Sequence, residues 1–261
     1  MMKFCPIASG SSGNCCYIGT ETTHLLVDAG LSGKRIEAAL SSVGINNISG
    51  ILVTHEHSDH VSGAGILSRK YNVPVYATQN TWRFLLRHGT IGKVSVEMQK
   101  TIVPGQPVTI GDIEVLSFDV PHDASHPVGY CLHSNGYKAA VATDMGYVTD
   151  TVRELLQDTD VLLIESNHDI EMLRNGKYPQ MLKERVMSSR GHLSNVAAGA
   201  LLAEISSDTC RHIFLGHLSE ENNRPMIALN TVQNILEANG RPIDKVSVAD
   251  RHEPSEMIVL K

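Results

Sequence analysis

Residues 51–60, which read Ile-Leu-Val-Thr-His-Glu-His-Ser-Asp-His, are the most informative stretch of the chain. The apolar run 51–53 predicts a short buried strand. Four ligand-type side chains follow it directly: His55, His57, Asp59 and His60. Loops at the carboxyl ends of strands are where open α/β sheets build their sites. In such a loop, two imidazoles can face one metal ion while the Asp-His pair faces a second, so the stretch predicts a two-metal site.

Three more ligand-type residues follow predicted strands. His122 comes after strand 113–120, Asp144 after strand 137–143 and His217 after strand 213–215. Each alone has a structural alternative, since Asp144 could cap a helix and His217 could be a satisfied rim histidine. His126 competes with His122, which directly follows its strand. Together with the loop, these residues total five His and two Asp, enough for a carboxylate-bridged pair of metals.

Periodicity elsewhere predicts a layered α/β protein. Predicted strands cover residues 24–28, 51–53, 73–77, 108–110, 113–120, 128–133, 137–143, 161–165, 213–215 and 245–249. Predicted helices cover residues 34–43, 62–71, a segment from Thr81, 149–157, 194–206 and 226–238. Ser134-Asn135-Gly136 predicts a hairpin between two of the strands.

Composition bounds the class of protein. The chain has 261 residues, 42% of them hydrophobic, with a formal net charge of −6. This size fits one domain over residues 1–261, and the acidity argues against broad non-specific nucleic-acid binding. Five cysteines without a C-x-x-C pair, no secretory leader and no membrane-length apolar run predict a cytoplasmic protein that makes no membrane contact. The sequence points to no obligate protein partner.

Thr54–His60 resembles the signature loop of the metallo-β-lactamase superfamily. The resemblance extends from Asp28 to His217 and implies a four-layer αββα sandwich. It further implies that His55, His57 and His122 bind one metal, that Asp59, His60 and His217 bind the other, and that Asp144 bridges them. Asp28 looks like the family's aspartate that supports the metal loop without binding a metal itself.

Four further segments resemble the YycJ (WalJ) branch of that superfamily, whose members are regarded as nucleases. They are Ser9–Asn14, His122–Ala124, Glu165–Asp169 and Gly191–Asn195. Asp144 is not the Cys of many true β-lactamases. Thioester hydrolases of the glyoxalase type share all seven ligands, but they carry a C-terminal helical addition, whereas only 44 residues follow His217 here.

His192 favours a phosphodiester substrate. It lies 25 residues before His217, ahead of a predicted helix that Ser194 or Asn195 caps. This arrangement is similar to that of the superfamily's tRNA-processing nucleases, in which a non-ligand histidine precedes the helix before the last metal histidine. An imidazolium there could protonate a leaving oxygen. The alternative is a histidine with a purely structural role at a helix start.

Five residues are predicted to contact substrate: Ser12, Asn14, His168, Lys183 and Arg185. Ser12 and Asn14 lie in a Gly-Ser-rich segment that could equally be a turn between two short strands. Lys183 and Arg185 belong to the most basic stretch, 174–190, which is either a phosphate-binding edge or a solvated helix face.

We therefore expect a dinuclear phosphodiester hydrolase, an exonuclease acting on DNA or RNA. Asp59 would orient the attacking hydroxide and His192 would assist the leaving oxygen. Nitrogen and oxygen ligands suit Zn²⁺ or Mn²⁺, with Fe²⁺ as a further candidate. The alternatives are a thioester or small-molecule hydrolase with the same metals and a non-catalytic binder of nucleic-acid ends.

Overall fold

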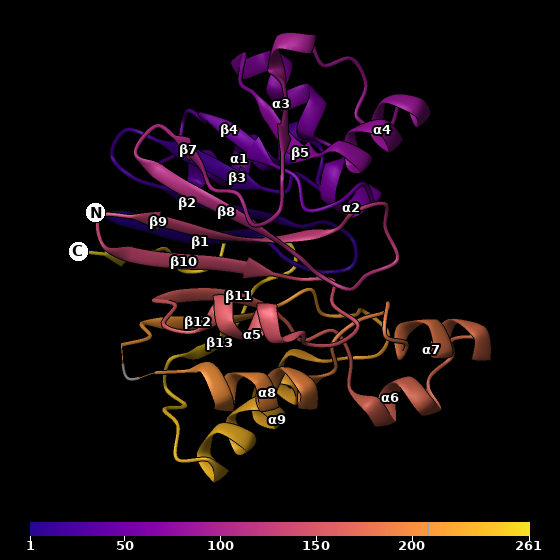
Figure 1. Cartoon of the computed structure of the whole chain (residues 1–261). Helices are drawn as coiled ribbons and strands as arrows, with labels where there is room; N and C mark the ends of the chain where they lie inside the picture. The colour runs from indigo at the N-terminus through magenta and orange to yellow at the C-terminus, as the bar shows by residue number, and fades with distance from the viewer. Residues whose placement is uncertain (208) are drawn as a thin grey trace.

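Two seven-stranded sheets lie face to face in the structure, a computed structural model that describes residues 1–207 and 209–261 (Figure 1). The first sheet contains, in spatial order, β14 (Ile258–Leu260), β1 (Met2–Ala8), β2 (Cys15–Gly19), β3 (His24–Val27), β4 (Gly50–Leu52), β5 (Val75–Thr78) and β6 (Gln99–Ile102). The second contains β13 (Val246–Val248), β12 (His212–Gly216), β11 (Val161–Glu165), β10 (Tyr137–Ala142), β9 (Val128–Ser134), β8 (Ile113–Asp119) and β7 (Val108–Ile110).

Helices pack on the outer face of each sheet. The helices that follow strands of the first sheet are α1 (Gly33–Ser42), α2 (Ser58–Val61), α3 (Ala64–Tyr71) and α4 (Gln79–His88), with a 3₁₀ turn at Val96–Met98. Those of the second half are α5 (Asp150–Leu156), α6 (Ile170–Asn175), α7 (Gln180–Val186), α8 (Asn195–Ile205) and α9 (Pro225–Ala238). Apolar residues of α1, α3 and α4 share a buried cluster with the first sheet, and those of α5, α8 and α9 share one with the second.

A third buried cluster fills the space between the sheets. The rings of Phe4 and Phe214 stack there with centroids 6.0 Å apart, one from each sheet. Next to Phe4, Cys5 points the other way and joins the core under the helices, as the alternation of side chains along a strand requires. Three apolar layers thus separate four layers of structure, which confirms the αββα sandwich expected from the sequence.

Strand direction places one set of loops together. Strands β3 to β6 pair in parallel, and so do β10 to β13, while β8 runs in the same direction as β10 because both are antiparallel to β9. The carboxyl ends of these strands carry the loops that lead into α2, α4 and α6, which gather at one end of the molecule (Figure 1).

The structure differs from the predicted elements mainly in short segments. The helix expected over 62–71 begins at Ala64 and is preceded by the one-turn α2. Gly63 lies between the two helices, where a Cβ would come within 2.4 Å of the Leu31 carbonyl oxygen. The hairpin turn is confirmed, with positive φ at Asn135 and Gly136. Strands β6 and β14 and helix α6 were not predicted. Strands β1 and β2 flank the segment Ser9–Asn14, and α7 lies within 174–190, as the alternatives of a turn between two strands and of a helix face had it. No helix among the described residues is long and apolar enough to cross a lipid bilayer.

Candidate metal centre

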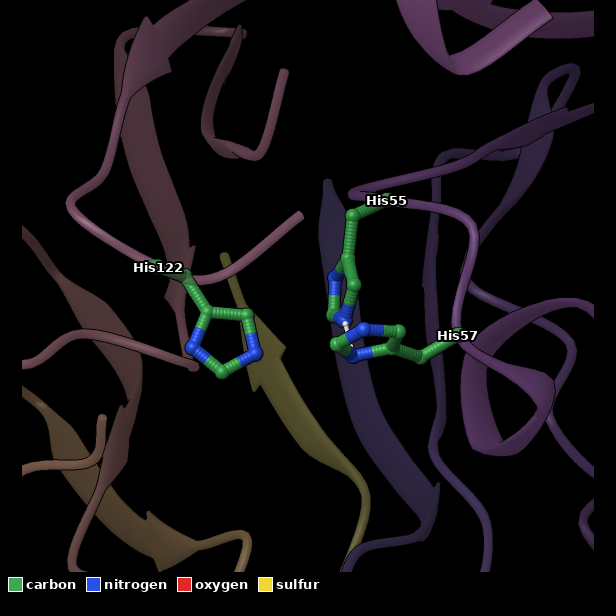
Figure 2. Close-up of side chains that lie close together, drawn as sticks. All are labelled: His55, His57 and His122. Atoms are coloured by element: carbon green, nitrogen blue, oxygen red, sulfur yellow. Dashed lines mark hydrogen bonds between the residues drawn. The ribbon is translucent and has the colours of Figure 1, made fainter. Parts of the chain in front are cut away.

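The loop after β4 presents its side chains in two directions. His55 and His57 lie in the non-helical part of the loop, where His55 Nε2 is 2.9 Å from His57 Nδ1 (Figure 2). His57 is the N-cap of α2, whose first turn carries Asp59 and His60. Asp59 and His60 thus lie in the helix whereas His55 and His57 precede it, although the rings of His55 and His60 still approach each other, with centroids 4.2 Å apart.

His122 reaches His55 and His57 from the opposite sheet (Figure 2). Ligand atoms of the three histidines lie within 4.8 Å of one another. His122 Nδ1 donates a hydrogen bond to the Gly191 carbonyl (3.0 Å), which leaves Nε2 as the nitrogen with a free lone pair. His126 turns away and pairs with Asp119 at 2.8 Å, so the structure favours His122 over its competitor.

A second group forms around Asp59. Its Oδ2 lies 3.4 Å from His60 Nε2 and 3.5 Å from His217 Nε2, and His217 comes directly after β12. Asp144 lies between the two groups, with Oδ2 3.3 Å from His60 Nε2 and Oδ1 3.7 Å from His122 Nε2. This is the position that a bridging carboxylate would need.

The donor atoms fit a divalent cation. His122 Nε2, Asp144 Oδ2 and His217 Nε2 are buried, and none has a hydrogen-bond partner among the described residues. Buried polar atoms are rarely left unpaired, because each costs free energy. Burial lowers the pKa of His217, but Asp144, Asp59 and Glu165 raise it overall to about 10. The negative charges that would hold a proton on His217 would equally attract a metal ion.

Two buried carboxylates orient the histidines from behind. Asp28 Oδ2 accepts a hydrogen bond from His60 Nδ1 at 2.7 Å, and Asp28 Oδ1 accepts one from the Thr54 amide at 2.8 Å. Glu165, the last residue of β11, was not predicted as part of the site. Its Oε1 accepts hydrogen bonds from His217 Nδ1 (2.9 Å) and His192 Nδ1 (2.7 Å). A carboxylate that ends an apolar strand was the available signal.

His192 lies beside the metal ligands but has a different environment. Its side chain is 22% exposed, and its Nδ1 is held by Glu165, so Nε2 is the nitrogen available to a substrate. Burial lowers the pKa of His192, yet Glu165 and Asp144 raise it overall. The geometry therefore favours a protonated imidazole at the edge of the centre.

The centre opens into a cavity of about 350 Å³. Its lining includes candidate ligands and residues of the segment that carries α6 and α7: His57, Asp59, His122, Asp144, His217, His192, Tyr178, Leu182, Arg185 and Val186. Ser11, Ser219 and Asn222 complete one side. The candidate metal groups therefore face a space that solvent and a ligand can enter.

The five predicted substrate contacts are placed unequally. Arg185 lines the cavity and pairs with Asp123 at 2.5 Å. Ser12 is exposed but does not line it. Asn14 is buried on the Nε2 side of His60, with Nδ2 3.2 Å from that nitrogen, and its backbone amide donates a hydrogen bond to the Asp59 carbonyl at 2.8 Å. Asn14 is thus placed to support the loop, and Ser12 makes no contact with the centre.

His168 and Lys183 also lie outside the cavity lining. His168 is 2% exposed and forms a bridge with Ser194, so the fold covers it. Lys183 Nζ donates a hydrogen bond to the Arg174 carbonyl (2.7 Å), so the lysine side chain extends from α7 toward the end of α6. Neither side chain lines the cavity: the bridge of His168 is made by its backbone, and its buried Nδ1 has no hydrogen-bond partner among the described residues.

Comparison with known proteins places the chain in a family. The family model described as "Beta-lactamase superfamily domain" matches residues 23–218. The chain is 46% identical over 241 residues to "Exodeoxyribonuclease YycJ" of Bacillus anthracis, covering 92% of this chain and 90% of that protein. It is 41% identical over 236 residues to "Exodeoxyribonuclease WalJ" of Streptococcus pneumoniae, covering 90% and 88%.

A solved structure gives the same answer for the fold. The metallo-β-lactamase fold protein YhfI from Bacillus subtilis superposes with a TM-score of 0.70 at 16% identity, over 98% of this chain and all of that one. The family match spans most of the chain, and both named relatives align over nearly their whole length. The chain therefore belongs to the β-lactamase superfamily, in the branch that holds the YycJ and WalJ proteins.

Proposed function

We propose that this protein is a metal-dependent exodeoxyribonuclease that hydrolyses phosphodiester bonds at the centre built on His55–His60. The observation that carries the proposal is the approach of His122, Asp144 and His217 from the second sheet to the loop of the first. The names of two relatives that align over about nine tenths of the chain support DNA as the substrate and removal of nucleotides from an end.

The proposed ligand set divides between two divalent ions, Zn²⁺ or Mn²⁺, with Fe²⁺ as a further candidate. His55, His57 and His122 would hold one ion, and Asp59, His60 and His217 the other, with Asp144 between them. When bound, such a pair would supply a hydroxide and neutralise charge on the phosphate. Asp28 and Glu165 would fix the rings so that Nε2 of His60 and His217 faces the ions.

The chain's own residues would then position the reaction. Asp59, whose side chain is 23% exposed, is the proposed carboxylate that accepts a hydrogen bond from the attacking water and orients it. His192 would donate a proton from Nε2 to the leaving oxygen, because Glu165 holds its Nδ1 and favours the protonated ring. The same imidazolium would stabilise negative charge on a non-bridging oxygen.

Action on a strand end fits the shape of the cavity. At about 350 Å³ it lies near the lower limit of ligand pockets in general. Tyr178, Leu182 and Val186 line it from the α6–α7 segment. A terminal nucleotide is a better fit for such a space than the middle of a duplex.

The thiols agree with a cytoplasmic location, which we propose for the protein. All five cysteines are free and buried, including the neighbours Cys5, Cys15 and Cys16. Burial raises the pKa of the Cys5 thiol to about 12, so it stays protonated. Unpaired thiols in close company are typical of a reducing compartment.

One assay panel tests the function. Purified protein supplied with Mn²⁺ or Zn²⁺ is incubated with labelled single-stranded DNA and RNA bearing 5′-phosphate or 5′-hydroxyl, beside a glutathione thioester and a β-lactam. We expect stepwise shortening of the DNA by the wild type and none by a His57→Ala variant. Turnover of the thioester or the β-lactam alone would replace the proposal with a small-molecule hydrolase.

A further inference from the structure

A second, shallower hollow continues from the metal centre along the molecular surface. His122 lines both the central cavity and a neighbouring one of about 430 Å³, and Ser125 lines both that one and a third of about 350 Å³ against α4. These shared residues place the three hollows next to one another. We name the two outer hollows together the α4 groove. Its lining outside the central cavity includes Tyr147, Arg190, Asn80, Arg83, Phe84, Arg87 and His88.

The walls of the α4 groove are tied to the metal centre. The hydroxyls of Thr78 and Thr81, in the first turn of α4, both lie within hydrogen-bond distance of the His126 carbonyl (3.2 and 3.4 Å). On the same loop, the amide and hydroxyl of Ser125 donate to Glu56 Oε1 at 2.7 and 2.6 Å. The loop that carries His122 therefore links α4 to the loop after β4, and the groove keeps a fixed relation to the centre.

The opposite wall is fixed by a close backbone approach. The Gly146 amide donates to the Pro121 carbonyl at 2.8 Å, and a Cβ at Gly146 would meet the backbone of Ser189 and Arg190 within 2.6 Å. The absence of a side chain at Gly146 thus allows the backbone after Asp144 to pass between the His122 loop and Arg190. Tyr147, 50% exposed, stands at the edge of the groove as a result.

Three arginines in the α4 groove have no carboxylate partner. Arg83, Arg87 and Arg190 are exposed and form no ion pair with a described residue. By contrast, Arg153, Arg174 and Arg185 each pair with an acidic side chain. Arg83 and Arg87 are one helical turn apart, so their like charges repel unless an anion lies between them.

The hollow that adjoins the central cavity at Ser219 has no such excess of positive charge. A hollow of about 370 Å³ shares Ser219 with the central cavity and contains Arg224 and Arg251, but Glu220 and Asp250 line it as well. In the α4 groove the only lining carboxylate among the described residues is Asp119, which pairs with His126. A protein with a net charge of −6 needs such a local excess of cations to attract a polyanion.

We propose that the α4 groove binds the single-stranded DNA that adjoins the scissile bond, an inference that rests on the proposed function. Arg83, Arg87 and Arg190 contact backbone phosphates. The exposed ring of Tyr147 and the half-buried ring of Phe84, which packs against His88 with centroids 4.3 Å apart, offer faces on which bases stack, the combination that sequence-independent single-strand binding uses. The centre would then receive the end of a strand whose following nucleotides lie along α4.

The test compares charge removal with charge conservation. A fluorescent single-stranded 12-mer is titrated with Arg83→Ala/Arg87→Ala in EDTA, where no cleavage occurs, beside Arg83→Lys/Arg87→Lys and Arg211→Ala. Arg211 is an exposed arginine outside the groove. We expect about tenfold weaker binding in the alanine double variant, and a slope of log K against log salt that is smaller by about 1.4, for two lost phosphate contacts. The lysine variant and Arg211→Ala should keep the wild-type slope.

A second measurement separates this inference from the function it rests on. With metal supplied, the wild-type KM should fall as the substrate lengthens from a dinucleotide to a 12-mer, and this fall should be smaller in Arg83→Ala/Arg87→Ala, which keeps only Arg190 and the aromatic rings of the groove. An alanine variant that matches Arg211→Ala in slope and length dependence overturns the groove assignment. Failure of the wild type to shorten DNA overturns the nuclease proposal, while the EDTA titration still reports on the groove.

Discussion

Asp28 and Glu165 stand in matching positions on opposite sheets. Each carboxylate accepts a hydrogen bond from Nδ1 of one candidate metal histidine, His60 at 2.7 Å and His217 at 2.9 Å. Each also accepts a hydrogen bond from a backbone amide, that of Thr54 or Met145, both at 2.8 Å. The two halves of the sandwich thus build their halves of the centre in the same way, with a buried carboxylate behind an imidazole.

Glu165 should affect both metal binding and turnover, because it holds His217 and His192 together. Burial raises the pKa of Glu165, but the charges and hydrogen bonds of the two histidines lower it overall, so it acts as an acceptor. In Glu165→Gln the negative charge is lost, and the amide nitrogen cannot accept the two hydrogen bonds that one carboxylate oxygen takes, either from the two histidines at Oε1 or from the Met145 and Leu193 amides at Oε2. We expect metal affinity or activity to fall by roughly 10- to 100-fold, the usual effect of losing a group that orients a metal ligand.

Metal analysis by mass spectrometry and DNA-cleavage rates measure this effect. Glu204→Gln is the matched control, since Glu204 is a surface acid that pairs with Arg153 far from the centre. Wild-type metal content together with wild-type rates in Glu165→Gln would show that the histidines do not depend on this carboxylate.

Metal addition should stabilise the fold. The unpartnered atoms His122 Nε2, Asp144 Oδ2 and His217 Nε2 destabilise the metal-free protein, and the two proposed ions together would satisfy all three. At a free metal concentration a thousandfold above Kd, binding adds about 4 kcal/mol to the free energy of unfolding. Thermal unfolding with EDTA or with Zn²⁺ measures the shift in Tm. His57→Ala should reduce the shift, whereas a control at His133, a partly buried histidine of β9, should leave it intact.

The candidate ligand set could be named from the sequence because each member follows a visible apolar run. His122, Asp144 and His217 come after β8, β10 and β12, and the rule that sites form at the carboxyl ends of strands brings them together. Glu165 was not predicted as part of the site, because its position in the sequence indicates only the last residue of a strand. Its role depends on contacts with Met145 and Leu193, which no local pattern reports.

Backbone conformation at the centre was equally hidden. Asp28, Asp144 and His217 all have positive φ, between 53° and 62°, and each lies within two residues of the end of a strand. Residues other than glycine seldom adopt this region, and such conformations cluster at functional sites. The left-handed turn redirects the chain so that the side chain enters the centre. Asp and His adopt this region more often than most other non-glycine residues, but side-chain identity alone does not fix it.

Stability should fall on the acid side because of His168. Burial lowers the pKa of this histidine from 6.5 to about 4, so the folded protein takes up its proton later than the unfolded chain. Between these values the unfolded state binds more protons, and stability is therefore lost as pH falls from 6.5 toward 4. The loss from pH 7.5 to pH 5 amounts to about 2 kcal/mol.

Urea unfolding in EDTA at pH 7.5 and pH 5 tests this in the wild type and in His168→Gln, which cannot titrate. The variant should lose about 2 kcal/mol less than the wild type between the two conditions. Equal losses in both proteins would mean that His168 is not the group responsible.

His192 can be separated from the metal ligands by the choice of leaving group. Its Nε2 is the proposed proton donor, and Glu165 holds its Nδ1 at 2.7 Å. Because positioned general acids contribute about 10²- to 10⁴-fold, His192→Ala should lose a factor of that order on DNA, whose leaving alkoxide needs a proton. A p-nitrophenyl phosphodiester expels a stable phenolate, so its hydrolysis should fall far less, with metal content unchanged. A His57→Ala variant should instead lose both activities, since it removes a ligand. Equal losses on the two substrates in His192→Ala would assign His192 to phosphate binding in place of proton donation.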